Sequence, residues 1–283
     1  MKIIDRKMEV RILLKLNPRE VIRRAGDHLI VCEDLEKLHL KFAEDIFNEI
    51  HNNNKSGKLT RLILPIGPIG QYPLLVDMVK KQNLNLSKCW FFFMDEYCDE
   101  AGFALKLNHP LSFKRIAKNT LLIPLKEYGI NDYQILFPNE ENINNIENKI
   151  IEIGGIDTCY GGLGIHGHIA FNEPSINIAT SNPRKVELNE YTITINSIRA
   201  NVGGNLENFP KKAFTIGMKQ ILGANRIRLY CRNGSPYDWA NTILRIALFG
   251  EPGDDYPVTY IRNHLDYKII TDRVTLANPE YII

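Results

Sequence analysis

The sequence predicts an α/β fold in which helices cover both faces of a mainly parallel, Rossmann-like sheet. Short apolar segments of strand length alternate along the chain with segments of helical periodicity, and this alternation favours parallel strands connected by helices. The chain has 283 residues, of which 44% are hydrophobic, and one continuous α/β core accommodates that length and composition. We therefore expect a single domain over residues 1–283.

The first half of the chain supplies two helices and two strands. Residues 34–51 carry apolar side chains mostly at helical spacing, with Asp34 as an N-cap, and the following NNNKSGK ends the helix. LTRLILPIGPIG at 59–70 is typical of a short strand that runs into a glycine–proline loop, and 72–82 is typical of a helix. CWFFFM at 89–94, the longest apolar run, suits a buried strand and is far shorter than the roughly 20 residues of a membrane span.

The second half supplies three more strands, predicted at 156–164, near 226–231 and at 267–271. Between the first two lies a polar stretch at about 181–208, which we expect to be a small mobile lid. Ligands of open α/β sheets collect at the carboxyl ends of strands. We therefore expect the functional residues in the loops that follow strands, at 65–71, 95–102, 161–174 and 231–236.

Charge and cysteine content narrow the class of partner. The formal net charge of +2 arises from 35 basic and 33 acidic residues spread along the chain, so no patch of one sign predicts a nucleic acid or membrane partner. A small molecule is the expected ligand. The five cysteines lack CxxC spacing, which argues against disulfides and a cysteine zinc site and favours reduced thiols in a cytoplasmic protein.

The segment MDEYCDEAG at 94–102 follows the most apolar strand. A carboxylate at the rim of a low-dielectric core is poorly solvated, so it is a stronger base and a candidate for taking a proton from carbon. Asp95 is that candidate. The alternative is that Asp95 and Glu96 only cap the next helix.

GIHGHIAFNEP at 164–174 places two histidines and a carboxylate in a glycine-rich turn. His168 and Glu173 would make an acid/base pair in which the carboxylate orients the ring. His166 and His168 with a carboxylate could instead bind a metal, but no third histidine or cysteine lies nearby, so we expect no metal. A purely structural turn is the other alternative.

Anion-binding groups are few. The loop LPIGPIGQ at 64–71 lies where a phosphate cradle is expected, between a strand and a helix. Pro65 and Pro68 lack N–H donors and the isoleucines lack hydroxyls, so an ordinary turn explains the loop equally well. Arg199 and Arg232 are candidates to meet an anion, or else solvated surface charges.

Four segments in this order resemble the glucosamine-6-phosphate deaminase family, whose relatives include the 6-phosphogluconolactonases. FMDEY at 93–97 resembles the segment of the catalytic base, NHPLSFKRIAKNTLL at 108–122 the helix after it, GHIAFNEP at 167–174 the family signature, and FPKKAFTIGMKQIL at 209–222 a later helix entry. The resemblance implies a NagB/RpiA/CoA transferase-like fold. Residues 1 to about 25 have no counterpart and are expected to form an extension.

The resemblance also implies residue roles. Asp95 would move a proton between C2 and C1 of an open-chain amino sugar phosphate, and His168, oriented by Glu173, would open the sugar ring. His166 would belong to the same catalytic set. No metal or organic cofactor is implied, because enolisation next to a carbonyl or imine needs only a placed base and acid. A homo-oligomer is expected, and substrate binding is expected from Ile66, Gly67, Glu96, Asn172 and Arg199.

Three features of the sequence depart from the family pattern. His166 stands where the family has aspartate, Ile66, Pro68 and Ile69 stand in the loop where it has hydroxyl residues, and no lysine follows the GS of RNGSPYDWA at 232–240. Each charge-assisted hydrogen bond to a phosphate is worth about 1.5–3 kcal/mol. The changes in the loop and the missing lysine therefore predict phosphate binding weakened by a factor of hundreds.

Three functions remain open from the sequence. The first is a sugar isomerase or deaminase that uses Asp95, His168 and Glu173. The second is a lactonase-like hydrolase in which His168 activates water, although the retained Asp95 counts against it. The third is a sugar-binding or regulatory protein without turnover, which the altered loop and His166 favour.

Overall fold

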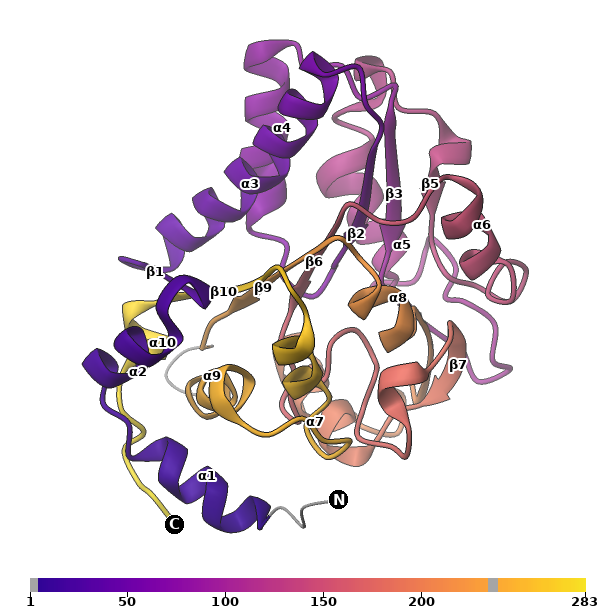
Figure 1. Ribbon diagram of the computed structural model, residues 1–283. Helices are drawn as coiled ribbons and strands as arrows, with labels where there is room; N and C mark the ends of the chain where they lie inside the picture. The colour runs from indigo at the N-terminus through magenta and orange to yellow at the C-terminus, as the bar shows by residue number, and fades with distance from the viewer. Residues whose placement is uncertain (1–4, 234–238) are drawn as a thin grey trace.

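The computed structural model describes residues 5–233 and 239–283. Within these residues, seven strands form one sheet, all neighbours parallel, in the order β1-β10-β9-β6-β2-β3-β5 (Figure 1). Three more form a small antiparallel sheet in the order β4-β8-β7. The strands are β1 Leu29–Cys32, β2 Thr60–Leu64, β3 Cys89–Phe93, β4 Asp95–Tyr97, β5 Ile135–Leu136, β6 Thr158–Gly162, β7 Arg184–Glu187, β8 Lys212–Thr215, β9 Arg226–Cys231 and β10 Tyr267–Asp272.

Helices cover both faces of the large sheet, which confirms the predicted α/β fold. The α-helices are α1 Arg6–Leu14, α2 Pro18–Ala25, α3 Leu35–Lys55, α4 Gln71–Gln82, α5 Phe113–Ala117, α6 Ile146–Glu152, α7 Glu190–Arg199, α8 Met218–Leu222, α9 Ala240–Phe249 and α10 Arg273–Leu276. Short 3₁₀ segments lie at Gly26–His28, Lys126–Tyr128, Asp132–Gln134, Ile178–Thr180 and Pro257–Asn263, and a π turn at Lys118–Leu122. None of the helices described is long and apolar enough to cross a membrane.

The strands divide their side chains between two hydrophobic cores. In β3, Phe92 packs in the core under α8 and α9, whereas Phe91 and Phe93 pack in the core under α3 and α4. Ile269 and Ile270 of β10 divide in the same way. Successive side chains of a strand point to opposite faces, so a strand buried on both faces must be apolar throughout. This explains why the continuous run CWFFFM is a strand.

The long helix α3 confirms the predicted helix and extends past its predicted end. Asp34 caps it by accepting from the Lys37 backbone N–H at 2.8 Å. The asparagines expected to end the helix form its last turn instead. Asn53 donates to Thr60 Oγ1 at 3.1 Å and Asn54 donates to the Asn85 carbonyl at 2.7 Å. These tertiary hydrogen bonds offset the poor helix propensity of asparagine.

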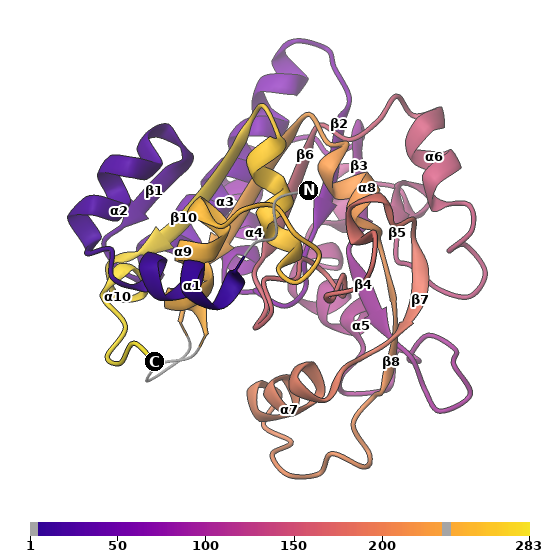
Figure 2. The same ribbon diagram turned by 60° about the horizontal axis from the view of Figure 1, so that its bottom comes forward.

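The stretch expected to be a lid contains regular structure. Within 181–208, β7 pairs with β8 and is followed by α7, whose N-cap Asn189 accepts from the Thr192 backbone N–H at 2.9 Å. Figure 2 shows β7 and β8 side by side with α7 beyond them. The stretch at 181–208 is polar because the small sheet that contains β7 has one face exposed to solvent. Whether the segment opens and closes stays a prediction.

The N-terminal residues pack on α9. Arg245 of α9 is fully buried, and its guanidinium donates to the carbonyls of Leu16, between α1 and α2, and of Leu276 in α10. Arg6 donates to Asp255 at 2.7 Å. Within the predicted extension, residues 5 to about 25 are therefore held by side chains far along the chain.

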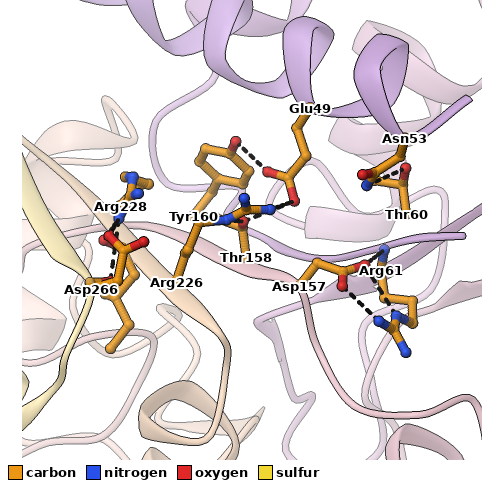
Figure 3. A network of polar contacts seen from close by, with 11 residues as sticks. Glu49, Asn53, Thr60, Arg61, Asp157, Thr158, Tyr160, Arg226, Arg228 and Asp266 are labelled. Carbon is orange, nitrogen blue, oxygen red and sulfur yellow. Dashed lines mark hydrogen bonds and ion pairs between the residues drawn. The ribbon is translucent and has the colours of Figure 1, made fainter. Parts of the chain in front are cut away.

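A polar network closes the amino ends of β2, β6 and β9 (Figure 3). Arg61 forms a two-pronged ion pair with Asp157, at 2.6 and 3.0 Å. Glu49 of α3 accepts from Thr158 Oγ1, Tyr160 Oη and Arg226 Nη2 at 2.6–2.9 Å. Nearer the other end of these strands, Tyr230 Oη donates to Asp45, also of α3. The helix α3 thus binds the central strands β6 and β9 at two points along their length.

Candidate active site

A cavity of about 300 Å³ lies at the carboxyl ends of β2, β3, β6 and β9. Asp95 and His168 both line it, so the two groups on which the predicted chemistry depends share one space. Most of the other lining side chains are apolar or aromatic. They include Ile66, Ile69, Leu163, Phe113, Phe171, Tyr97, Tyr230 and Trp239, with polar groups from Asn196, Arg199 and Arg232.

Asp95 begins β4, directly after the apolar strand β3 and Met94, and is 7% exposed. Burial, and after it the charge of Glu96, raises the pKa of Asp95 from 3.8 to about 8. Such a carboxyl group holds its proton near neutral pH and is a strong base once ionised. A pKa near the working pH suits a general base.

Glu96 does not lie where it was expected. It follows Asp95 on the same strand, so its side chain points to the opposite face of β4. There its carboxylate accepts hydrogen bonds from Ser112 Oγ and from the backbone N–H groups of Tyr97, Phe113 and Lys114, at 2.8–3.0 Å. It holds the start of α5, and it is not among the residues that line the cavity. This placement replaces the substrate-binding role expected for Glu96 with a capping role.

The His168 ring lies directly against the backbone of Gly164. The Gly164 backbone N–H donates to the His168 carbonyl at 2.9 Å, which folds the loop back on itself. A Cβ atom at position 164 would lie 1.9 Å from His168 Nε2, so any other residue would displace the ring. Gly167 has φ +64°, and a Cβ there would come within 2.8 Å of Val258 Cγ1. The two glycines therefore fix the place of the imidazole.

Glu173 does not orient His168 in this structure. Its Oε2 accepts from the Asn189 backbone N–H at 2.9 Å, at the start of α7. Its Oε1 and the Nδ1 atoms of His166 and His168 are buried without hydrogen-bond partners among the residues described. The charge of Glu173 raises the pKa of His166, although burial outweighs it and leaves that pKa lowered. Glu173 therefore binds the start of α7, and its charge acts on His166.

His166 lies beside the cavity and is not among its lining residues. Its ring centroid is 6.0 Å from that of His168 and 5.3 Å from that of Tyr191 on α7, which meets it edge-on. The aspartate of the family would have placed a negative charge here. The imidazole instead disfavours protonation of His168.

Asn172 holds the loop at 164–174 in place through hydrogen bonds made outside the cavity. It is fully buried, and its amide nitrogen donates to the carbonyls of Ile169 at 3.0 Å and Ile216 at 2.8 Å. Its oxygen accepts from Arg184 at 2.9 Å and from Ser181 at 3.3 Å. Both ends of the amide form hydrogen bonds within the protein. Asn172 therefore links the loop to the small sheet in place of the substrate contact that was expected.

The loop after β2 lines the cavity with Ile66 and Gly67, as expected, but offers few donors. Pro73 removes an N–H from the first turn of α4, and the Tyr72 N–H donates to the Ile69 carbonyl at 3.1 Å. The His39 ring lies so close to Gly70 that a Cβ there would be 2.3 Å away. This helix start is therefore a poor phosphate cradle.

Two arginines give the cavity its positive charge. Arg199, at the end of α7, places its guanidinium carbon 3.9 Å from the ring centroid of Trp239. The indole in turn donates to the Leu163 carbonyl at 3.1 Å. Arg232 follows β9, and its charge contributes to lowering the pKa of His39. Of the loop expected at 231–236, residues 234–236 lie outside the described part of the chain.

Sequence reasoning missed Tyr97, Asn196 and Trp239, all of which line the cavity. For Tyr97 a signal existed, because residues two apart on a strand share a face and Asp95 had been identified. Trp239 and Asn196 come from distant segments, and no spacing in the sequence connects them to Asp95.

The buried histidine predicts an acid-sensitive fold. Burial, and after it the charge of His166, lowers the pKa of His168 from 6.5 to about 3. Below about pH 6.5 the unfolded chain binds a proton that the folded chain rejects, so this stability is complete above that pH and is lost toward pH 3. We expect the melting temperature to fall between pH 7 and 5, and to fall less in His168→Gln. Parallel curves for the two proteins would contradict the assignment.

The architecture and this cavity define a protein of the NagB superfamily fold. A solved structure described as a monomeric glucosamine-6-phosphate deaminase and missing link of that superfamily matches with a TM-score of 0.75 and 25% identity, over 87% of this chain and 98% of the other. A 6-phosphogluconolactonase of Thermotoga maritima matches with a TM-score of 0.63 at 14% identity, which shows the shared fold alone. No family model matches the chain.

The chain belongs to the glucosamine-6-phosphate deaminase family. It is 30% identical over 251 residues to the glucosamine-6-phosphate deaminase of Clostridium botulinum strain Loch Maree, which covers 87% of this chain and 96% of the relative. The enzyme of the same name in Caenorhabditis elegans is 31% identical over 207 residues, 71% of this chain and 74% of the relative. The resemblance read from the motifs is thereby confirmed.

Proposed function

We propose that the protein is an aldose–ketose isomerase or deaminase that acts on an amino sugar or its phosphate. The observation that carries the proposal is the placement of Asp95 and His168 in one cavity. A carboxylate and a neutral imidazole are the two groups that ring opening and enolisation require. Family membership supports the same class of reaction.

Ring opening is assigned to His168. Its pKa of about 3 keeps the imidazole neutral, with one ring nitrogen that donates and one that accepts. Nδ1 is buried, so one ring nitrogen carries out both transfers. It takes the proton of the C1 hydroxyl and passes it to the ring oxygen as the C1–O bond breaks, and the imidazole ends the step neutral.

Proton transfer between carbons is assigned to Asp95. As a carboxylate it takes the proton from C2, and the electron pair of the C2–H bond forms the C1–C2 double bond. The same proton, or one from solvent, is then delivered to C1. If C2 carries an amine, the product is an imine, which water converts to a ketose with release of ammonia. The transfer requires the ionised form, so its rate should rise with pH through about 8.

The charge of the cavity favours an anionic substituent on the sugar. Arg199 and Arg232 line it, and a guanidinium binds phosphate or carboxylate oxygens with two N–H groups. The loop after β2 adds little, as described above. A sugar phosphate held mainly by arginines fits these groups.

Solvent deuterium exchange tests the proposal. Glucosamine 6-phosphate and glucosamine are incubated with the protein in D₂O, deuterium at the carbon next to the carbonyl is followed by NMR, and ammonia is measured. We expect exchange with at least one of the two sugars, and ammonia release with it. The absence of both deuterium exchange and ammonia release with the two sugars would contradict the proposal.

The second candidate is a sugar-binding protein without turnover. The poor phosphate loop and the imidazole at His166 favour it. A rise in melting temperature with these sugars, without exchange or ammonia, would support this candidate. Acid release from sugar lactones in a pH-stat would support the lactonase-like hydrolase instead.

The cellular compartment and the oligomeric state of the protein are also proposals. We propose a cytoplasmic protein with reduced thiols, supported by the burial of four of the five cysteines. We also propose a homo-oligomer, although a solved deaminase of similar fold is described as monomeric. Light scattering of the purified chain measures its mass in solution.

A further inference from the structure

Tyr97 is fixed in the cavity wall beside the proposed base. It lies two residues after Asp95 on β4, so both side chains emerge on the same face of the strand. Both line the cavity, and Tyr97 is 4% exposed. Its ring packs against three phenylalanine rings with centroids 4.7, 5.3 and 5.5 Å away, those of Phe113, Phe171 and Phe209. The phenol oxygen is therefore held in place.

The helix α7 determines which hydrogen bonds the phenol oxygen of Tyr97 can form. Asn196 of α7 donates from Nδ2 to Tyr97 Oη at 3.1 Å. A phenol has one hydrogen to donate as well as lone pairs that accept. Since the amide occupies a lone pair, the hydrogen stays available, and among the residues described none accepts it. Burial, with the charge of Asp95, raises the pKa of Tyr97, so the group remains a neutral donor.

We propose that Tyr97 is a further catalytic residue, which donates a hydrogen bond to the O1 oxygen of the opened sugar while Asp95 takes the proton from C2. This inference rests on the proposed function. As the C2–H electron pair forms the C1–C2 double bond, the π pair of the C1–O bond moves onto O1. The phenol stabilises that charge. The nitrogen lone pair on C2 then forms the C2–N double bond, the C1–C2 π pair takes the proton from Asp95 at C1, and a proton passes from the nitrogen to O1 through solvent. No other reactant is needed.

Asn196 is then a positioning residue. It acts through Tyr97, because its amide directs the phenol hydrogen away from α7 and into the cavity. The direction of the phenol hydrogen thus depends on α7, the helix that carries Asn196.

Kinetics of C2 exchange in D₂O test the inference, with glucosamine 6-phosphate as the probe. Tyr97→Phe removes the hydroxyl and keeps the ring, and we expect kcat to fall about 100-fold with a smaller change in KM, as for loss of one donor to a developing oxyanion. Asn196→Asp replaces the donor by an acceptor, which attracts the phenol hydrogen away from the cavity, so kcat should fall as well. Tyr133→Phe, at an exposed tyrosine, is the matched control and should retain the wild-type kcat.

The outcomes separate the two proposals. If the wild-type protein exchanges deuterium and folded Tyr97→Phe keeps kcat within twofold of it, the role of Tyr97 is overturned and the proposed function stands. If Tyr97→Phe does not fold, an unchanged kcat in Asn196→Asp overturns the role equally. If the wild-type protein exchanges nothing, both fall together.

Discussion

Replacing Asp95 with asparagine should lower C2 proton exchange by about 10²–10⁴-fold and should make the protein more stable. Asparagine has the shape of aspartate but cannot take a proton. The pKa of Asp95 is raised to about 8 by burial, so above pH 4 the unfolded chain releases a proton that the folded chain retains. Wild-type stability therefore falls as pH rises from about 4 to 8, and the gain in Asp95→Asn should be near zero at pH 4 and on the order of 5 kcal/mol at pH 9.

The measurement pairs exchange rates with thermal unfolding at pH 4, 7 and 9. Asp77→Asn is the control, since Asp77 is exposed on α4 and should change neither quantity. Asp95→Asn with the exchange rate of the wild-type protein would remove Asp95 from the role of base. A loss of exchange together with a loss of stability would point to damage of the fold.

Replacing His168 with glutamine should slow reaction of cyclic sugars by about 10²–10⁴-fold, because His168 is assigned to ring opening. Glutamine retains a donor and an acceptor but cannot pass a proton between them. The ring position is fixed by Gly164 and the loop carbonyl, so the change is local. Turnover of glucosamine 6-phosphate measures the loss.

A substrate that cannot form a ring supplies the control. Glyceraldehyde 3-phosphate is too short to cyclise, so its C2 exchange in D₂O bypasses ring opening. His168→Gln should exchange this aldehyde at a rate within a few-fold of the wild-type protein. An equal loss on both substrates would move His168 from ring opening to the enolisation step.

Much of the fold followed from local patterns in the sequence. The apolar strands β2, β3 and β6 and the Asp34 cap of α3 were predictable because burial on both faces and capping leave marks within a few residues. The strands of the small sheet have no comparable pattern in the sequence. Strands β4 and β7 have three and four residues, and β7 has polar residues because one face is exposed.

The candidate site was predictable for Asp95 and His168 and not for their neighbours. Glu96 and Asn172 belong to the right segments, but their side chains turn away from the cavity to bind α5 and the small sheet. Which way a side chain turns depends on strand pairing and on distant donors such as the Asn189 N–H that binds Glu173. A motif identifies the segment, whereas tertiary contacts assign each residue its task.

The helix α3 has a consequence for how the cavity keeps its shape. Tyr230 forms part of the cavity wall, stacks on Phe42 at 3.6 Å and donates to Asp45, while Glu49, one turn further on, binds Arg226 at the far end of the strand that carries Tyr230. Side chains of α3 outside the cavity thus help to hold the strand that supplies one of its walls. Substitutions on this helix can therefore change the shape of the cavity while every residue that lines it stays the same.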